Sequence, residues 1–135
     1  MITRRAALCF IPGALIASAI PGVLRPAFAV ERVPFDRPAF EAALKSGKPV
    51  LVDVSATWCI TCKAQHVVLD KLFATPRFAG FTVFAVDYDT QKDVMRSFGV
   101  DQRSTLIVFK GGHEIDRSSW QTSEEAIAAL LAKAV

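Results

Sequence analysis

Hydrophobic and polar positions along the chain predict four strands and four helices after residue 29. The strands are expected at Pro49–Ser55, Phe81–Asp87, Thr105–Phe109 and Glu114–Ser118. The first two are apolar, β-branched runs bounded by turn residues, as in strands buried inside a parallel sheet. The last two flank a Lys-Gly-Gly-His turn and therefore predict a β-hairpin. Residues 30–35, before the first helix, are expected to be a short lead-in.

The helices are expected at Asp36–Ser46, at Cys59 to about Phe73, at Thr90–Phe98 and at the C-terminus. Asp36 is placed to cap the first helix, and Gly47 fits its C-terminal cap. In the second helix a helical period links Ala64, Val67 or Val68, Lys71 and Leu72. A capping box at Thr122-Ser123-Glu124-Glu125 opens the last helix.

The order of these elements is helix, strand, helix, strand, helix, strand, strand, helix. Strands that alternate with helices imply right-handed crossovers and an α/β fold. We expect one domain with a central mixed, mainly parallel sheet flanked by helices. Ligand sites of such sheets lie at the carboxyl ends of strands.

Residues 1–29 have the pattern of an export signal. Thr3-Arg4-Arg5 supplies a basic start, an apolar run follows from Ala6 to about Leu24, and Ala27-Phe28-Ala29 supplies the small residues of a cleavage site. Cleavage after Ala29 would leave a domain of residues 30–135. The paired arginines suit the twin-arginine route, and general secretion is the other route open. An uncleaved membrane anchor is the alternative, but two Pro-Gly pairs interrupt the run.

The charge balance changes if this segment is removed. The full sequence of 135 residues has 16 basic and 13 acidic residues. Residues 1–29 hold three of the basic residues and no acidic one, so 13 of each sign remain. A nearly neutral domain gives no electrostatic reason to expect nucleic acid or anionic membranes as partners. We expect a periplasmic or otherwise exported protein with no stable membrane association after signal cleavage.

The sequence Trp58-Cys59-Ile60-Thr61-Cys62-Lys63 joins the first predicted strand to the second helix. Two cysteines at this spacing can close a small disulfide with little backbone movement. If Cys59 begins the helix, unpaired N–H groups and the helix dipole favour its thiolate, the form that attacks disulfides. Outside the cytoplasm such a pair forms either a structural or a catalytic disulfide. A domain of this length can build a core without a disulfide, which leaves the two cysteines free for chemistry.

Residues 30–135 resemble the thioredoxin family in these motifs and in their order. The matching positions are Leu51-Val52-Asp53, Ala56, Trp58-Cys59-x-x-Cys62-Lys63, Gly99-Val100, Thr105-Leu106, Phe109 and Gly112. Within the family, Gly47-Lys48-Pro49-Val50 followed by the cysteine motif is most similar to periplasmic thioredoxin-like domains. These include the C-terminal domain of the thiol:disulfide interchange reductase. The resemblance implies a thioredoxin-like fold and thiol–disulfide oxidoreductase activity, with reduction of protein disulfides favoured.

The resemblance also implies roles for individual residues. Cys59 would be an exposed nucleophile at the helix start, and the more buried Cys62 would resolve the mixed disulfide. Asp53 lies on a strand expected to be interior, where an ionised carboxylate is costly, and it would pass a proton to or from Cys62. The alternative for Asp53 is a strand-end residue bonded to backbone. Trp58 is expected to cover the motif, while Lys63 is expected to be a solvated charge.

This chain departs from the family pattern at three places. Ser104 stands before Thr105, where the family has a cis-proline in the loop that pairs with substrate, so the bond before Ser104 is expected to be trans. Ala85 stands where many thioredoxins have a lysine near the buried aspartate. Trp120 falls near a family glycine, where it would be either an apolar platform for partners or a packed core residue. Substrate contacts are therefore assigned to Trp58, Ser104, Thr105 and Trp120.

Two alternatives to the enzyme remain open at this point. Cys59, Cys62 and His66, one turn further along the helix, would offer three soft ligands to copper or zinc in a metal-binding or redox-sensing module. The disulfide could also be only structural. For the enzyme we expect no bound cofactor, because the sequence has no nucleotide-binding motif. Its partners would be protein disulfides or thiols and a membrane electron donor.

Overall fold

The computed structural model describes residues 30–135, so the expected export signal lies outside the described residues. Five strands form one mixed sheet in the order β1-β3-β2-β4-β5. They are β1 (Arg32–Pro34), β2 (Val50–Ser55), β3 (Thr82–Asp87), β4 (Thr105–Lys110) and β5 (His113–Ser119). β1, β3 and β2 are parallel to one another, whereas β4 runs antiparallel to both β2 and β5. The expected α/β fold with a central mixed sheet is confirmed.

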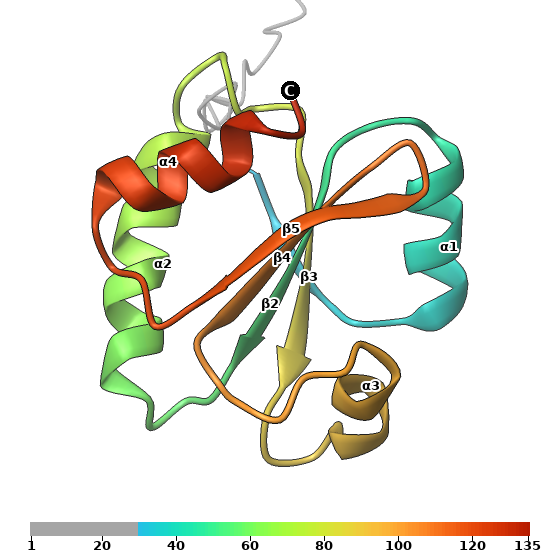
Figure 1. The fold of residues 1–135 in the computed structure, drawn as a ribbon, viewed down its shortest axis with the longest axis vertical. Helices are drawn as coiled ribbons and strands as arrows, with labels where there is room; N and C mark the ends of the chain where they lie inside the picture. The colour runs from blue at the N-terminus through green and yellow to red at the C-terminus, as the bar shows by residue number, and fades with distance from the viewer. Residues whose placement is uncertain (1–29) are drawn as a thin grey trace, which may run out of the picture.

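Four helices cover the two faces of this sheet (Figure 1). They are α1 (Arg37–Lys45), α2 (Ile60–Phe73), α3 (Lys92–Ser97) and α4 (Glu124–Ala132). α2 and α4 share one hydrophobic cluster with the sheet, and α1 and α3 share the other. None of the helices in the described range is long and apolar enough to cross a membrane.

Local signals in the sequence fix most helix ends. The Asp36 carboxylate accepts the N–H of Ala39 at the start of α1, as expected for an N-cap. Gly47 follows α1 with a φ of 73°, a left-handed conformation that glycine adopts at little cost. At α4 the cap lies one residue later than the predicted capping box, because Ser123 accepts the N–H of Ala126.

The stretch before α1 is not only a lead-in. Arg32, Val33 and Pro34 form β1, which pairs in parallel with β3 at the edge of the sheet. A three-residue strand is too short to show a clear alternation of polar and apolar positions, and proline is tolerated at a sheet edge. The correction matters for the site, because β1 brings Arg32 next to the reactive end of β2.

The core places β2 at the centre of the molecule. Val50, Leu51, Val52 and Val54 are completely buried, since helices cover both faces of the sheet at this strand. Each such side chain contributes about 1.5–3 kcal/mol relative to an exposed one. A strand fixed in this way holds its carboxyl end, and the residues that follow it, in a set position.

Candidate functional site

Cys59 and Cys62 form a disulfide across the first turn of α2, with their Cα atoms 5.3 Å apart. The pair follows the carboxyl end of β2, as the sequence predicted. Cys59 is the N-cap of α2, and its Sγ accepts the backbone N–H of Cys62 at 3.1 Å. This N–H group and the helix dipole both favour negative charge on Cys59 Sγ once the disulfide is opened.

The expectation that Cys59 is exposed is wrong for the disulfide form. Cys59 is only 2% exposed and Cys62 is completely buried. Ala56 and Tyr88 pack against the two cysteines, and Ser104 closes over them from another part of the chain. A partner can therefore reach Cys59 Sγ only across the side chains that surround it.

Ser104 lies directly on the disulfide. Its Oγ is 3.2 Å from Cys59 Sγ and 3.1 Å from Cys62 Sγ, and the residue is completely buried. No peptide bond is cis within residues 30–135, so the Arg103–Ser104 bond is trans as expected, and Ser104 has a φ of 57°. A hydroxyl at this position can donate a hydrogen bond to a thiolate, which the proline of the family pattern cannot do.

Thr105, at the start of β4, is also buried. Its hydroxyl donates to the carbonyl of Gln102 and lies 2.8 Å from the Ser119 hydroxyl. Thr105 thus ties the loop that carries Ser104 to the end of β5. Its predicted contact with substrate, like that of Ser104, remains a prediction.

Asp53 is completely buried on β2 and contacts His66 of α2. The distance from Asp53 Oδ2 to His66 Nε2 is 2.7 Å, and Arg32 Nε lies 3.7 Å from the same oxygen. The other carboxylate oxygen, Oδ1, has no hydrogen-bond partner among the described residues. Ala85 is opposite Asp53 in the sheet register, so the lysine of the family pattern is indeed missing. Its place beside the carboxylate is taken by side chains from α2 and β1, which the sequence analysis did not connect with Asp53.

A pocket of about 500 Å³ opens beside Cys62 and His66. Lys63, Ala85 and Gln91 are also among the residues that line it. The completely buried Cys62 and the half-buried His66 therefore border the same pocket. Ser104 is not one of the residues that line it.

The metal alternative does not gain support from this arrangement. Within the described range, no three His, Cys, Asp or Glu side chains are grouped so that they could hold an ion. His66 points its Nε2 at Asp53 instead of joining the two sulfurs. A role for His66 as the third ligand would require the ring to leave that contact.

Trp58, Arg103 and Trp120 surround the cysteine motif at the surface. Trp58 is 53% exposed and Trp120 is 42% exposed, so Trp120 is not the packed core residue of the second alternative. The guanidinium carbon of Arg103 lies 4.8 Å from the ring centroid of Trp58 and 4.9 Å from that of Trp120. Trp58 also donates its indole N–H to Asp89 at 2.8 Å. Its predicted role as a cover over the motif remains a prediction.

Sequence analysis missed Gln65, which is completely buried on α2. Its amide nitrogen donates to the carbonyl oxygens of Ser104 and Gln121, at 3.2 and 2.8 Å. One side chain thereby ties both loops that border the site to the helix carrying the cysteines. The available signal was spacing, because Gln65 lies three residues after Cys62 and four before Leu69, on the buried face of the helix.

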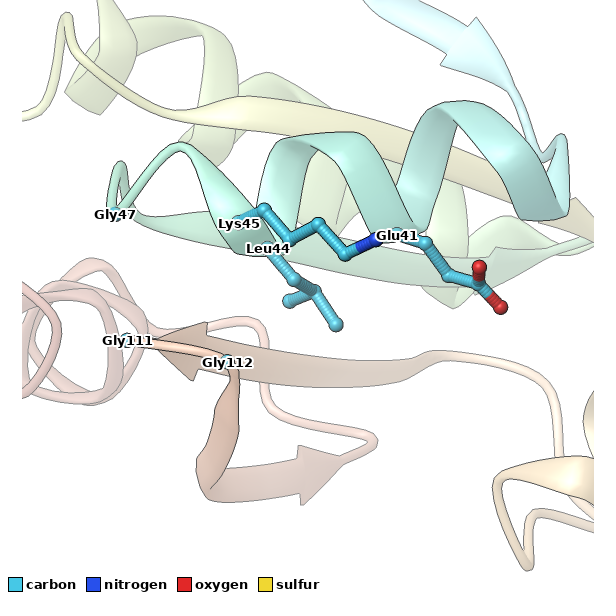
Figure 2. A pocket seen from close by; sticks show the side chains of 6 residues that line it. All are labelled: Glu41, Leu44, Lys45, Gly47, Gly111 and Gly112. Carbon is cyan, nitrogen blue, oxygen red and sulfur yellow. The ribbon is translucent and has the colours of Figure 1, made fainter.

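A second pocket, of about 450 Å³, lies away from this site (Figure 2). It lies between the C-terminal end of α1 and the β4–β5 turn. Figure 2 shows the Lys45 side chain extending toward Glu41, with the Leu44 side chain pointing away from α1 toward the turn. Gly47, Gly111 and Gly112 complete its lining. The turn is at the opposite end of β4 from Ser104, so this pocket has no part in the cysteine chemistry.

The family model of thioredoxin matches residues 31–133, which include every element described above. The chain belongs to the thioredoxin family. It is 46% identical over 74 residues to thioredoxin of Mycobacterium tuberculosis (strain ATCC 25618 / H37Rv), covering 55% of this chain and 63% of that protein. It thus spans slightly less than two thirds of this relative. The thiol:disulfide interchange protein DsbE of Yersinia pestis is 40% identical over 75 residues, covering 55% of this chain and 38% of the relative.

A solved structure supports the same assignment of this thioredoxin-family chain. The crystal structure of Trxlp from Edwardsiella tarda EIB202 superposes with a TM-score of 0.70 and 46% sequence identity. The match covers 73% of this chain and 95% of that one. The thioredoxin-like fold predicted from the cysteine motif and its surroundings is therefore confirmed.

Proposed function

We propose that this protein is an exported thiol–disulfide oxidoreductase that reduces protein disulfides through Cys59 and Cys62. One observation carries the proposal: the disulfide spans the N-terminal turn of α2, with a backbone N–H on Cys59 Sγ and the Ser104 hydroxyl against both sulfurs. These donors suit a sulfur that alternates between a neutral disulfide and a thiolate. A purely structural disulfide has no need of them.

The reaction starts from the dithiol form. The Cys59 thiolate attacks one sulfur of a partner disulfide, and the partner's other sulfur leaves as a thiolate and takes up a proton. Cys62 then loses its proton and attacks Cys59 Sγ, which releases the second partner sulfur as a thiolate that is protonated in turn. The partner gains two electrons and two protons, and this protein ends as the disulfide described here.

Asp53 and His66 are proposed to handle the proton of Cys62. The Asp53 side chain is not exposed to solvent, whereas the His66 side chain is 31% exposed. His66 and Cys62 both line the 500 Å³ pocket. A proton accepted inside the protein can therefore pass to solvent at the His66 ring. The buried position of Cys62 makes such a route useful, because bulk water does not contact it directly.

The reductase direction and the location are parts of the same proposal. The pattern of residues 1–29 supports export, and the similarity to periplasmic thioredoxin-like domains supports a cell-envelope reductase recharged by a membrane electron donor. Reducing equivalents would arrive by thiol exchange, without a bound cofactor. Its substrates would be protein disulfides.

The reduction potential of the Cys59–Cys62 pair tests this function. The full-length chain is equilibrated with glutathione or dithiothreitol buffers, and the fraction of dithiol is measured by thiol alkylation. A potential near that of thioredoxin, about −270 mV, is expected for a reductase, whereas one near −120 mV would make the protein an oxidant. Export is tested separately, by locating the chain in cell fractions with and without Arg4→Lys/Arg5→Lys. Retention of the wild-type chain in the cytoplasm would contradict the proposed location.

A further inference from the structure

The surface around Cys59 contains a cation, Arg103, that forms no ion pair with any residue in the described range 30–135. Its Nε is buried and has no hydrogen-bond partner in the part of the chain that the structure describes. Its charge is instead held against the rings of Trp58 and Trp120, each within 5 Å of the guanidinium carbon. A guanidinium in contact with aromatic rings can still use its remaining N–H groups to bind a carboxylate.

Trp58, Arg103 and Trp120 are each connected directly to Cys59 or Ser104. Trp58 directly precedes Cys59, and Arg103 directly precedes Ser104, whose hydroxyl contacts both sulfurs. The backbone N–H of Trp120 donates to the Ser104 carbonyl at 2.9 Å. This surface therefore adjoins the nearly buried Cys59, where the disulfide of a polypeptide substrate would react.

The backbone conformation of Trp120 also indicates that this surface binds a partner. Its φ is 67°, which is unfavourable for a bulky side chain and persists only where the surroundings impose it. The strained backbone keeps a large aromatic ring 42% exposed, against Arg103 and beside the loop that covers the disulfide. Exposed tryptophan and arginine are the side chains most enriched at the energetic centres of protein interfaces.

We propose that Trp58, Arg103 and Trp120 form a docking surface for a polypeptide substrate that carries an aspartate or glutamate next to the cysteine attacked by Cys59. The inference rests on the proposed thiol–disulfide exchange and adds the chemistry of the preferred substrate. Arg103 binds the carboxylate, and the two indole rings bind the adjoining apolar part of the chain. Asp89 is an acidic side chain at this surface, but it accepts the Trp58 indole N–H, so it moderates the preference without abolishing it.

The test uses two disulfide-containing peptides that differ only in having Glu or Gln beside one cysteine. The reduced full-length chain is mixed with each peptide, and the second-order rate constant of peptide reduction is measured. We expect the Glu peptide to react about threefold faster or more at low ionic strength, and the ratio to approach one at about 1 M salt, where the Debye length is about 3 Å. Arg103→Gln is expected to bring the ratio to one, and Arg103→Lys to retain part of it.

Arg77→Gln is a matched control, because Arg77 also stacks on an aromatic ring, that of Phe78, but beyond the far end of α2. This variant should keep the wild-type ratio. Equal rates for the two peptides in a wild-type chain that does reduce both would overturn the docking proposal and leave the oxidoreductase standing. A chain that reduces neither peptide nor the uncharged 2-hydroxyethyl disulfide would instead overturn the proposed function. If Arg103→Gln fails to fold, the test rests on the wild-type chain, in which a Glu-to-Gln rate ratio that does not fall with salt would contradict the docking proposal.

Discussion

The Ser104 hydroxyl lies 3.2 Å from Cys59 Sγ, although the two residues are 45 positions apart in the sequence. The contact joins the loop before β4 to the first turn of α2. It places a second hydrogen-bond donor on the sulfur that already accepts the backbone N–H of Cys62. In the dithiol form, both donors are available to the same thiolate.

Ser104→Ala is expected to lower the thiolate-to-thiol ratio of Cys59 at neutral pH. A hydrogen bond to a charged group contributes about 1.5–3 kcal/mol, so the ratio should fall by about tenfold to a hundredfold. Alanine has the same Cβ as serine and carries a similar cost at a φ of 57°, so the variant isolates the hydroxyl. The ultraviolet absorbance of the thiolate, followed against pH in the reduced protein, measures the change.

Ser118→Ala serves as the control for this prediction. Ser118 lies on β5 opposite Leu106 and does not contact the sulfurs. If the thiolate titration curve of Ser104→Ala were identical to that of the wild type, the Ser104 hydroxyl would not stabilise the charged sulfur.

Asp53 and His66 should behave as an energetically coupled pair. Their side chains are 2.7 Å apart, and Asp53 is completely buried, so removal of His66 leaves a carboxylate with only Arg32 at 3.7 Å. We expect Asp53→Ala and His66→Ala to show a coupling free energy of about 1–3 kcal/mol in a double-mutant cycle of urea unfolding. A matched cycle of Asp53→Ala with Lys63→Ala should be additive. Additivity within about 0.5 kcal/mol in the His66 cycle would mean that the contact carries no stability.

Asp116 and Lys133 give the fold a pH-dependent contribution. Asp116 Oδ2 accepts Lys133 Nζ at 2.6 Å, and Oδ1 accepts the backbone N–H of Arg117. The Lys133 hydrogen bond first, and the Arg117 N–H second, lower the pKa of Asp116 below 3.8. A carboxyl group with a lowered folded-state pKa stabilises the protein above its unfolded-state pKa, and this stability is lost as the pH falls through the folded-state value.

The stability difference between wild type and Asp116→Asn should therefore be constant from neutral pH to about pH 5 and shrink below about pH 4. Both side chains are partly exposed, so the difference should stay below about 1 kcal/mol and decrease with salt. Thermal or urea unfolding against pH measures it, with Glu31→Gln as the control that removes a charge without removing an ion pair. A difference that grows as the pH falls would contradict this assignment.

Short-range patterns predicted much of this molecule, because they are read from neighbouring residues. The Asp36 cap, the turn at Gly47 and the buried strand at Val50–Ser55 all belong to this class. The cysteine motif likewise placed the disulfide at the start of α2. A three-residue strand such as β1 carries too little pattern to be found in this way.

The rest of the site depends on contacts between distant segments. Sequence analysis considered Ser104 as a missing proline and as a substrate contact, but its hydroxyl meets the sulfurs only after β4 pairs with β2. Spacing along α2 offers His66 as a metal ligand or as a half-exposed helix residue, and it does not show the contact with Asp53, which comes from another element. Arg103 was not singled out at all, because its importance arises from two tryptophans brought together by the fold.

Gln65 is expected to fix the loops that contain Ser104 and Gln121 against α2, so its loss should make both loops more mobile. In Gln65→Met the carbonyl of Gln121 loses its Gln65 donor, while the Ser104 carbonyl keeps the Trp120 N–H. Loss of the unpartnered Gln65 Oε1 offsets part of the cost, so we expect a destabilisation of about 1 kcal/mol. Hydrogen exchange at the Trp120 amide should accelerate more than exchange in β2, because the loops open locally. Lys63→Met, an exposed change on the same helix, should alter neither quantity. Equal acceleration at Trp120 and throughout β2 would mean that Gln65 stabilises the whole fold without clamping the loops.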